Sequence, residues 1–161
     1  MKSRKTWKEK LDDSKDLPKV ETIPQRLQVK WGTGTFVIPA SREVDELMRK
    51  VPKGKLTTIN ELRAVLAGKH GATVACPITT GIFAWISANA AEELVAIRPK
   101  ARITPYWRTL KTGGILNEKY PGGVARQKRL LEAEGHTVKT KGKHYQVVDS
   151  DKSLFDFGGR K

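Results

Sequence analysis

The middle of the chain contains segments whose apolar residues are spaced as in amphipathic helices. The first begins at Ser41, which we expect to be the N-cap, and ends before Pro52. Its apolar residues recur at i, i+3, i+4 and i+7, namely Val44, Leu47, Met48 and Val51. In the second segment, Thr58 and Glu61 have the spacing of a capping box. We expect it to turn Ile59, Leu62, Val65 and Leu66 toward the core and to end at Gly68 and Gly71.

A third helix is predicted to begin at Cys76-Pro77, where the missing N–H of proline costs nothing. One face would carry Ile78, Ile82, Trp85 and Ile86, and the other side Thr79, Thr80, Phe83, Ser87 and Asn89. Two short helices joined by a glycine-bearing connection are typical of a helix-turn-helix unit. This pair is therefore a candidate for contact with nucleic acid.

The segments on either side of these helices are shorter. Residues 1–28 have no sustained period, and we expect a basic arm with one helical turn near residues 7–11, docked through its few apolar side chains. Residues 31–39 predict a turn and a short strand. Residues 137–148 alternate across Lys141-Gly142, which predicts a hairpin that would serve as a wing. In the tail, we expect Leu154, Phe155 and Phe157 to dock on the domain.

Together these elements predict an α+β protein built on a winged helix-turn-helix domain, with an N-terminal arm and a C-terminal β-hairpin. The chain of 161 residues is long enough for one domain with its own core. We assign residues 1–40 to the basic arm and a short extended segment, 41–150 to the winged helix domain and 151–161 to the tail.

The charge of the chain narrows the class of partner. Its 31 Lys and Arg against 17 Asp and Glu give a formal net charge of +14. Between Arg98 and Lys143 there are twelve Lys or Arg and three Glu, a net of +9. Such clustering favours a polyanion, and nucleic acid is the leading candidate; the alternative is a protein that is merely basic.

Several other classes of protein are disfavoured by the sequence. The single cysteine, Cys76, excludes an intrachain disulfide, and three scattered histidines give no zinc pattern. No apolar run reaches the roughly 18 residues of a membrane helix. We expect a cytoplasmic monomer that needs no metal or other cofactor and does not act at a membrane.

The stretch from Thr104 to Gly135 carries the most specific pattern in the chain. It consists of Thr104-Pro105-Tyr106-Trp107-Arg108-Thr109, then Gly113-Gly114, Tyr120-Pro121-Gly122-Gly123 and Lys128-Arg129-Leu130-Leu131-Glu132-Ala133-Glu134-Gly135. The pattern resembles the active-site segment of the alkylguanine-DNA alkyltransferases, in which Pro-Cys-His-Arg is followed by a glycine turn, Tyr-x-Gly-Gly and Leu-Leu-x-x-Glu-Gly. The resemblance extends from about Val51 to Gly135 and includes Pro52-x-Gly54-x-Leu56-x-Thr58 and the segment Gly81 to Asn89.

The chain departs from that family at the catalytic positions. Tyr106 stands where the family has its acceptor cysteine, and Trp107 where it has the histidine that activates the thiol. A phenol is almost fully protonated at neutral pH and is a poor nucleophile toward an alkyl carbon. The family's base-rotating tyrosine falls at Ile59 and its inserted arginine near Ile78. Glu134 matches the family's glutamate, but we expect it to be a structural group at a helix end.

With these departures, the chain is similar to the alkyltransferase-like proteins, the non-enzymatic branch of the family. The resemblance implies DNA repair, with duplex DNA and a repair or regulatory protein as partners, and binding of duplex DNA, and of alkylated guanine, without repair. Two alternatives stay open. One is an active alkyltransferase that uses Cys76, placed at the start of a helix. The other is a sequence-nonspecific regulatory module that binds DNA or RNA.

Some candidate contact residues follow from the third helix and others from the basic segments. The candidates are Thr58, Ile78, Thr79, Thr80, Phe83, Asn89, Tyr106, Trp107, Arg108, Lys111, Gly122, Gly123, Arg126, Lys128 and Lys141. Thr79 and Phe83 either face the groove or belong to a turn and the core. Tyr106 and Trp107 either stack on an unstacked base or fill a closed pocket. We expect Arg108 to bind backbone carbonyls first and phosphate second.

Overall fold

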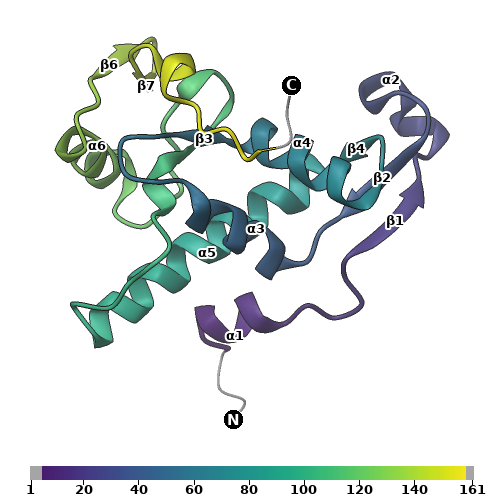
Figure 1. The fold of residues 1–161 in the computed structure, drawn as a ribbon, viewed down its shortest axis with the longest axis horizontal. Helices are drawn as coiled ribbons and strands as arrows, with labels where there is room; N and C mark the ends of the chain where they lie inside the picture. The colour runs from purple at the N-terminus through teal and green to yellow at the C-terminus, as the bar shows by residue number, and fades with distance from the viewer. Residues whose placement is uncertain (1–4, 159–161) are drawn as a thin grey trace.

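The computed structural model describes residues 5–158, in which three small β-sheets lie around a group of central helices (Figure 1). The largest sheet has the order β1-β2-β4. In it, β1 (Lys19–Thr22) pairs antiparallel with β2 (Thr35–Ile38), which pairs parallel with β4 (Val74–Ala75). A second sheet joins β3 (Thr57–Thr58) to β5 (Thr109–Leu110) in parallel. The α+β prediction is confirmed.

Three helices form the centre of the molecule: α3 (Ser41–Lys50), α4 (Ile59–His70) and α5 (Pro77–Ile97). Their main core contains Val44, Met48, Leu62, Leu66, Ala84 and Ala88, together with Val37 of β2. The prediction that the first two helices bury their apolar stripes is confirmed, because Val44, Met48, Leu62 and Leu66 are fully buried. Each of these helices thus contributes one face to a shared core.

The caps of α3 and α4 differ in detail from the predictions. The N-cap of α3 is Ala40, not Ser41; Ser41 Oγ instead donates to the carbonyl of Leu11, 2.6 Å away, and ties α3 to the N-terminal segment. Thr58 is the N-cap of α4, as predicted, and its Oγ1 accepts from the N–H of Glu61 at 3.2 Å. The helix continues through Gly68 and ends at Gly71, whose φ of 64° is the left-handed conformation that glycine adopts most easily.

The two predicted faces of α5 differ in burial. The side that packs inward carries small residues, Thr80, Ala84, Ser87, Ala88 and Ala91, which allow close contact with α3 and α4. Ile86 is also buried, whereas Ile78, Ile82 and Trp85 are exposed to 66%, 45% and 36%. The face that carries Ile78, Ile82 and Trp85 is therefore largely the outer face of the helix.

The N-terminal segment is docked, as predicted, through a short helix, α1 (Trp7–Asp12). The N–H groups of Trp7 and Lys8 donate to Glu93 of α5, each at 3.1 Å, and the Trp7 ring meets Trp85 edge-on at 4.9 Å. The pattern of residues 1–28 did not predict β1, the 3-10 turn η1 (Gln25–Leu27) or α2 (Gln28–Trp31). Figure 1 shows the β1-β2-β4 sheet and α2 on the side of the molecule opposite α6.

The second half of the chain surrounds a smaller core of Leu56, Leu110, Leu116, Leu131 and Val147. Its elements are η2 (Tyr106–Arg108), β5, η3 (Thr112–Gly114), α6 (Gly123–Ala133), β6 (Val138–Lys141), β7 (His144–Val147) and η4 (Ser150–Ser153). The predicted hairpin is confirmed, although Lys141 pairs with His144, so the turn residues are Gly142 and Lys143. The hairpin lies against the 111–116 segment, because Ile115 bridges to Gln146.

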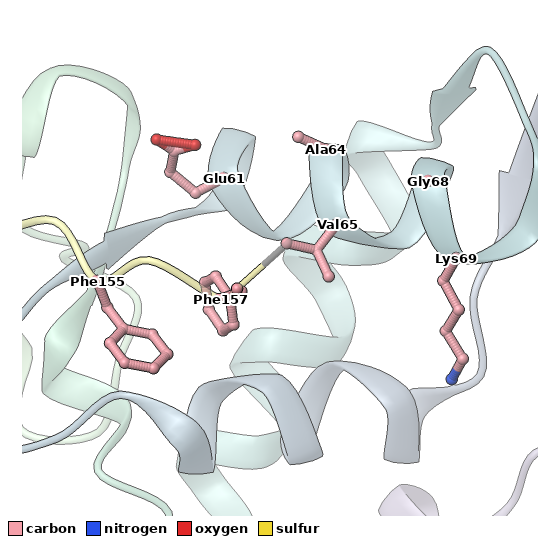
Figure 2. A pocket seen from close by; sticks show the side chains of 8 residues that line it. Glu61, Ala64, Val65, Gly68, Lys69, Phe155 and Phe157 are labelled. Atoms are coloured by element: carbon pink, nitrogen blue, oxygen red, sulfur yellow. The ribbon is translucent and has the colours of Figure 1, made fainter. Parts of the chain in front are cut away.

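The C-terminal tail docks as predicted. Leu56 bridges to Leu154, and the N–H of Phe155 donates to the carbonyl of Leu56 at 2.8 Å. Figure 2 shows Phe155 and Phe157 beside α4, where they line a hollow of about 390 Å³ together with Val65. The residues that line this hollow include none of the predicted contact residues.

Candidate nucleic-acid interface

Tyr106, at the position that the family resemblance assigns to an acceptor cysteine, is completely buried. Its ring lies edge-on to those of Trp107 and Tyr120, with centroids 5.4 and 5.3 Å away. Its hydroxyl donates to Glu92 Oε2 of α5 at 2.6 Å. Tyr120 is buried as well, and its hydroxyl donates to the carbonyl of Thr109. The two phenols fill this space, so the closed-pocket alternative is the one observed for Tyr106.

The environment of Tyr106 keeps its hydroxyl protonated. Burial, followed by the hydrogen bond to Glu92, raises the pKa of Tyr106 well above its ordinary value of 10.0. Arg126 Nε binds the same Glu92 Oε2 at 3.0 Å and supplies the compensating positive charge. Tyr106 therefore acts as a hydrogen-bond donor in a Tyr106–Glu92–Arg126 cluster and has no nucleophilic character at neutral pH.

A second cluster forms around Glu134, the C-cap of α6. Its carboxylate accepts from Trp107 Nε1 at 3.0 Å and from Arg108 Nη2 at 2.7 Å, and both charged side chains are largely buried. Burial works to raise the pKa of Glu134, but the bonds from Arg108 and Trp107 outweigh it and lower that pKa. The remaining arm of Arg108, Nη1, donates to the carbonyl of Val51 at 2.7 Å.

These contacts bear on the predicted roles of three residues. Tyr106 is inaccessible and is not placed to contact DNA in this conformation. Arg108 binds the carbonyl of Val51, as predicted, and pairs with Glu134, so it is not placed to contact phosphate in this conformation. Trp107 is half-buried and its indole N–H is already bonded to Glu134. The prediction that Glu134 is a structural group at a helix end is confirmed.

Three of the predicted α5 contacts, Thr79, Thr80 and Phe83, are also turned inward. Thr80 is fully buried and its hydroxyl donates to the carbonyl of Cys76 at 2.7 Å, so its predicted place in the groove is wrong. The Thr79 hydroxyl is enclosed, with no hydrogen-bond partner among residues 5–158. Phe83 packs against the main core, which is the alternative left open for it. The Asn89 amide donates to the carbonyl of Trp85 within the helix.

The outward face of α5 consists instead of Ile78, Ile82 and Trp85, of which only Ile78 is among the predicted contacts. Their spacing at i, i+4 and i+7 identifies one helix face but does not say whether it points inward. Trp85 Nε1 donates to the carbonyl of Lys119 at 3.0 Å, which joins this face to the loop before α6. We call Ile78, Ile82, Trp85 and Lys119 the α5 face.

Next to this face, α6 begins with two exposed or half-exposed glycines, Gly122 and Gly123. Gly122 has a φ of 81°, and a Cβ there would lie 2.6 Å from Arg126 Cδ, so a larger residue would strain the turn. No side chain caps the first turn of α6. Thr58 is half-buried at the start of α4, where its hydroxyl serves as the cap.

Of the candidate contacts Lys111, Arg126, Lys128 and Lys141, the first three are in ion pairs. Lys111 binds Glu118, Arg126 binds Glu92, and Lys128 binds Glu132. The Lys111 and Lys128 pairs are well exposed, and such pairs contribute at most about 1 kcal/mol, so phosphate could replace the carboxylates. Lys141 is exposed on the hairpin and has no ion pair among the described residues.

Cys76, the residue on which the enzymatic alternative depends, is buried at the N-cap of α5. It packs with Ile23 and Phe36 in a separate apolar cluster. Within residues 5–158 no group of three or more His, Cys, Asp or Glu could hold a metal ion. In the same part of the chain, no helix combines the length and apolar character that crossing a bilayer requires.

These observations define an α+β protein whose α4 and α5 are arranged as in a helix-turn-helix unit and whose Tyr106 is buried. No protein-family model matches the chain, and no curated protein matches its sequence. Two solved structures are similar to it, each covering 72% of this chain and 94% of the other. One is S. pombe ATL in complex with DNA, at 18% identity and a TM-score of 0.50. The other is S. pombe Atl1 in complex with damaged DNA containing O6-carboxymethylguanine, at 17% and 0.49.

This chain shares its fold with the S. pombe alkyltransferase-like protein. The fold that the sequence resemblance implies is therefore confirmed. The arrangement of α4, α5 and the hairpin is consistent with a winged helix-turn-helix domain. At this level of identity the similarity establishes the fold alone.

Proposed function

We propose that the protein binds duplex DNA through the α5 face and does not transfer alkyl groups. The observation that carries the proposal is the exposure of Ile78 and Ile82 on the second helix of a helix-turn-helix unit. Apolar side chains in such a position are usually covered by a partner, and sugar and base edges in a DNA groove accept them. The +14 charge favours a polyanionic partner.

The known structures with this fold support the same class of ligand. The S. pombe protein was crystallised in complex with DNA. In this chain, the uncapped first turn of α6 and the exposed Lys119 and Lys141 lie on segments that could meet phosphates beside the groove.

The absence of alkyl transfer is supported by the chemistry of the buried tyrosine. Tyr106 is protonated and enclosed, and Trp107 offers only an N–H that Glu134 already accepts. Cys76 packs in an apolar cluster with Ile23 and Phe36, away from Tyr106 and Tyr120. An acceptor needs a thiolate that can reach the alkyl carbon.

We further propose that affinity does not depend on an alkylated guanine. Tyr106 and Tyr120 fill the space beneath the 104–108 loop and are each bonded through their hydroxyls. Opening a base pocket there would break the Tyr106–Glu92 bond and separate three packed rings. Phosphate contacts and groove shape would then supply the binding energy.

Fluorescence anisotropy with two matched duplexes, one carrying a single O6-alkylguanine, tests this proposal. We expect equal affinities for the two duplexes and a plot of log affinity against log salt with a slope of about −3 or steeper, because several phosphates are neutralised. Tighter binding to the modified duplex by about tenfold or more, or tighter binding to an RNA duplex, would contradict it. Mass spectrometry of the same mixture should show no mass gain; an alkyl group on Cys76 would revive the enzymatic alternative.

A further inference from the structure

A trough with a strongly basic rim follows the connection between α5 and η2. It comprises two hollows of about 710 and 680 Å³ that share Arg102. We call it the basic trough and define it by Arg49, Lys50, Val51, Pro52, Leu94, Arg98, Pro99, Lys100, Ala101, Arg102, Ile103, Pro105, Trp107 and Arg108. Each hollow has the size of a small-ligand pocket, about 300–1,000 Å³.

The rim of the trough is cationic, and most of its charge is not compensated. No acidic residue lines either hollow, and six basic residues do: Arg49, Lys50, Arg98, Lys100, Arg102 and Arg108. Arg49 is paired with Asp45, and Arg108 with Glu134. The other four are exposed and form no ion pair among residues 5–158. Cations gathered in this way attract a polyanion and repel one another until it is bound.

The floor of the trough has the opposite character. Its accessible part is formed by the exposed Pro52 and the half-buried Ile103 and Trp107. A double helix offers phosphates to such a surface but keeps its bases stacked inside, so it would leave this floor uncovered. A single strand offers both phosphates for the rim and flat bases for the floor, the combination by which single-strand sites bind.

We propose that the basic trough binds a single-stranded segment of nucleic acid. Lys50, Arg98, Lys100 and Arg102 neutralise its phosphates, and a base lies against Pro52, Ile103 and Trp107. The trough is separate from the α5 face: Ile97, the last residue of α5, is 12 residues beyond Trp85, which corresponds to about 18 Å along the helix at about 1.5 Å per residue. Figure 1 shows the last turn of α5 projecting at the lower left, where the following segment turns back toward α6.

The test compares a labelled oligo-dT with duplex DNA, each titrated against the full chain by anisotropy. We expect the double variant Lys50→Glu/Arg102→Glu to weaken oligo-dT binding by about tenfold or more and duplex binding by less than about threefold. Both side chains are exposed, so the fold should be retained, which circular dichroism would confirm. The matched control is Lys30→Glu, an exposed lysine of α2, with an expected change of less than about twofold.

A second comparison separates base binding from charge alone. An abasic strand of the same length carries the same phosphates, and we expect it to bind about fivefold more weakly than oligo-dT because one stacked base is lost. Equal affinity for the two strands would overturn the proposal in favour of a purely electrostatic surface. An unchanged oligo-dT affinity in the double variant, or equal losses for strand and duplex, would overturn it as well. If the wild-type chain bound oligo-dT as expected but did not bind duplex DNA, the result would contradict the proposed function and not the proposal for the basic trough.

Discussion

Replacing Arg108 with methionine is expected to lower the free energy of unfolding by about 3–5 kcal/mol at neutral pH, the usual cost of leaving one partner of a buried ion pair alone. Glu134 would remain buried without its cation, and the carbonyl of Val51 would lose its donor. Lys128→Met is the matched control, because the exposed Lys128–Glu132 pair on α6 is expected to contribute less than about 0.5 kcal/mol.

The Arg108–Glu134 pair also predicts how the free energy of unfolding depends on pH. The pKa of Glu134 is lower in the folded protein than its ordinary value of 4.5, so its contribution is complete above that value. It is lost as the pH falls from 4.5 through the lower pKa of the folded state. Urea titrations at neutral and acid pH should therefore show the difference between wild type and Arg108→Met narrowing in acid. A difference below about 1 kcal/mol at neutral pH would refute a stabilising role for this pair.

The second large effect is expected on DNA binding. Ile82→Glu places a carboxylate in the middle of the α5 face, where it would meet phosphates, and should weaken duplex binding by about 2–3 kcal/mol, roughly 30- to 150-fold. Because Ile82 is 45% exposed, the expected change in stability is within about 0.5 kcal/mol.

The control for this variant lies on the same helix. Ile97 is the last residue of α5 and is 75% exposed, so Ile97→Glu introduces the same charge outside the α5 face. Anisotropy should show less than about a threefold change in duplex affinity for Ile97→Glu. Equal losses in the two variants would mean that net charge, and not the α5 face, determines binding.

The positions of α3, α4 and α5 could be predicted because their apolar spacing and their proline and glycine boundaries are local features. The orientation of α5 could not. Periodicity identified the face with Ile78 and Ile82 as the most apolar, but the helix packs through Ala84, Ala88 and Ala91, whose small size allows close approach. Strand β1 was missed because its burial does not alternate and only its pairing with β2 places it in a sheet.

The sequence predicted where the site lies along the chain but not which side chains surround Tyr106. The pattern from Tyr106 to Glu134 identified the segment that replaces a thiol and an imidazole. The partner of Tyr106 is Glu92, 14 residues earlier on α5, and Glu92 also binds Arg126. With 17 acidic and 31 basic residues, pairings of this kind cannot be deduced from the sequence, because they depend on how α5 packs against η2 and α6.

Hydrogen–deuterium exchange, measured with and without duplex DNA, tests the central claim most directly. If the protein binds duplex DNA through the α5 face, exchange should slow in residues 77–86 and 119–126 and stay unchanged in residues 19–38 of the N-terminal sheet. Protection confined to the N-terminal sheet or to residues 98–105, with none in the first half of α5, would contradict the account.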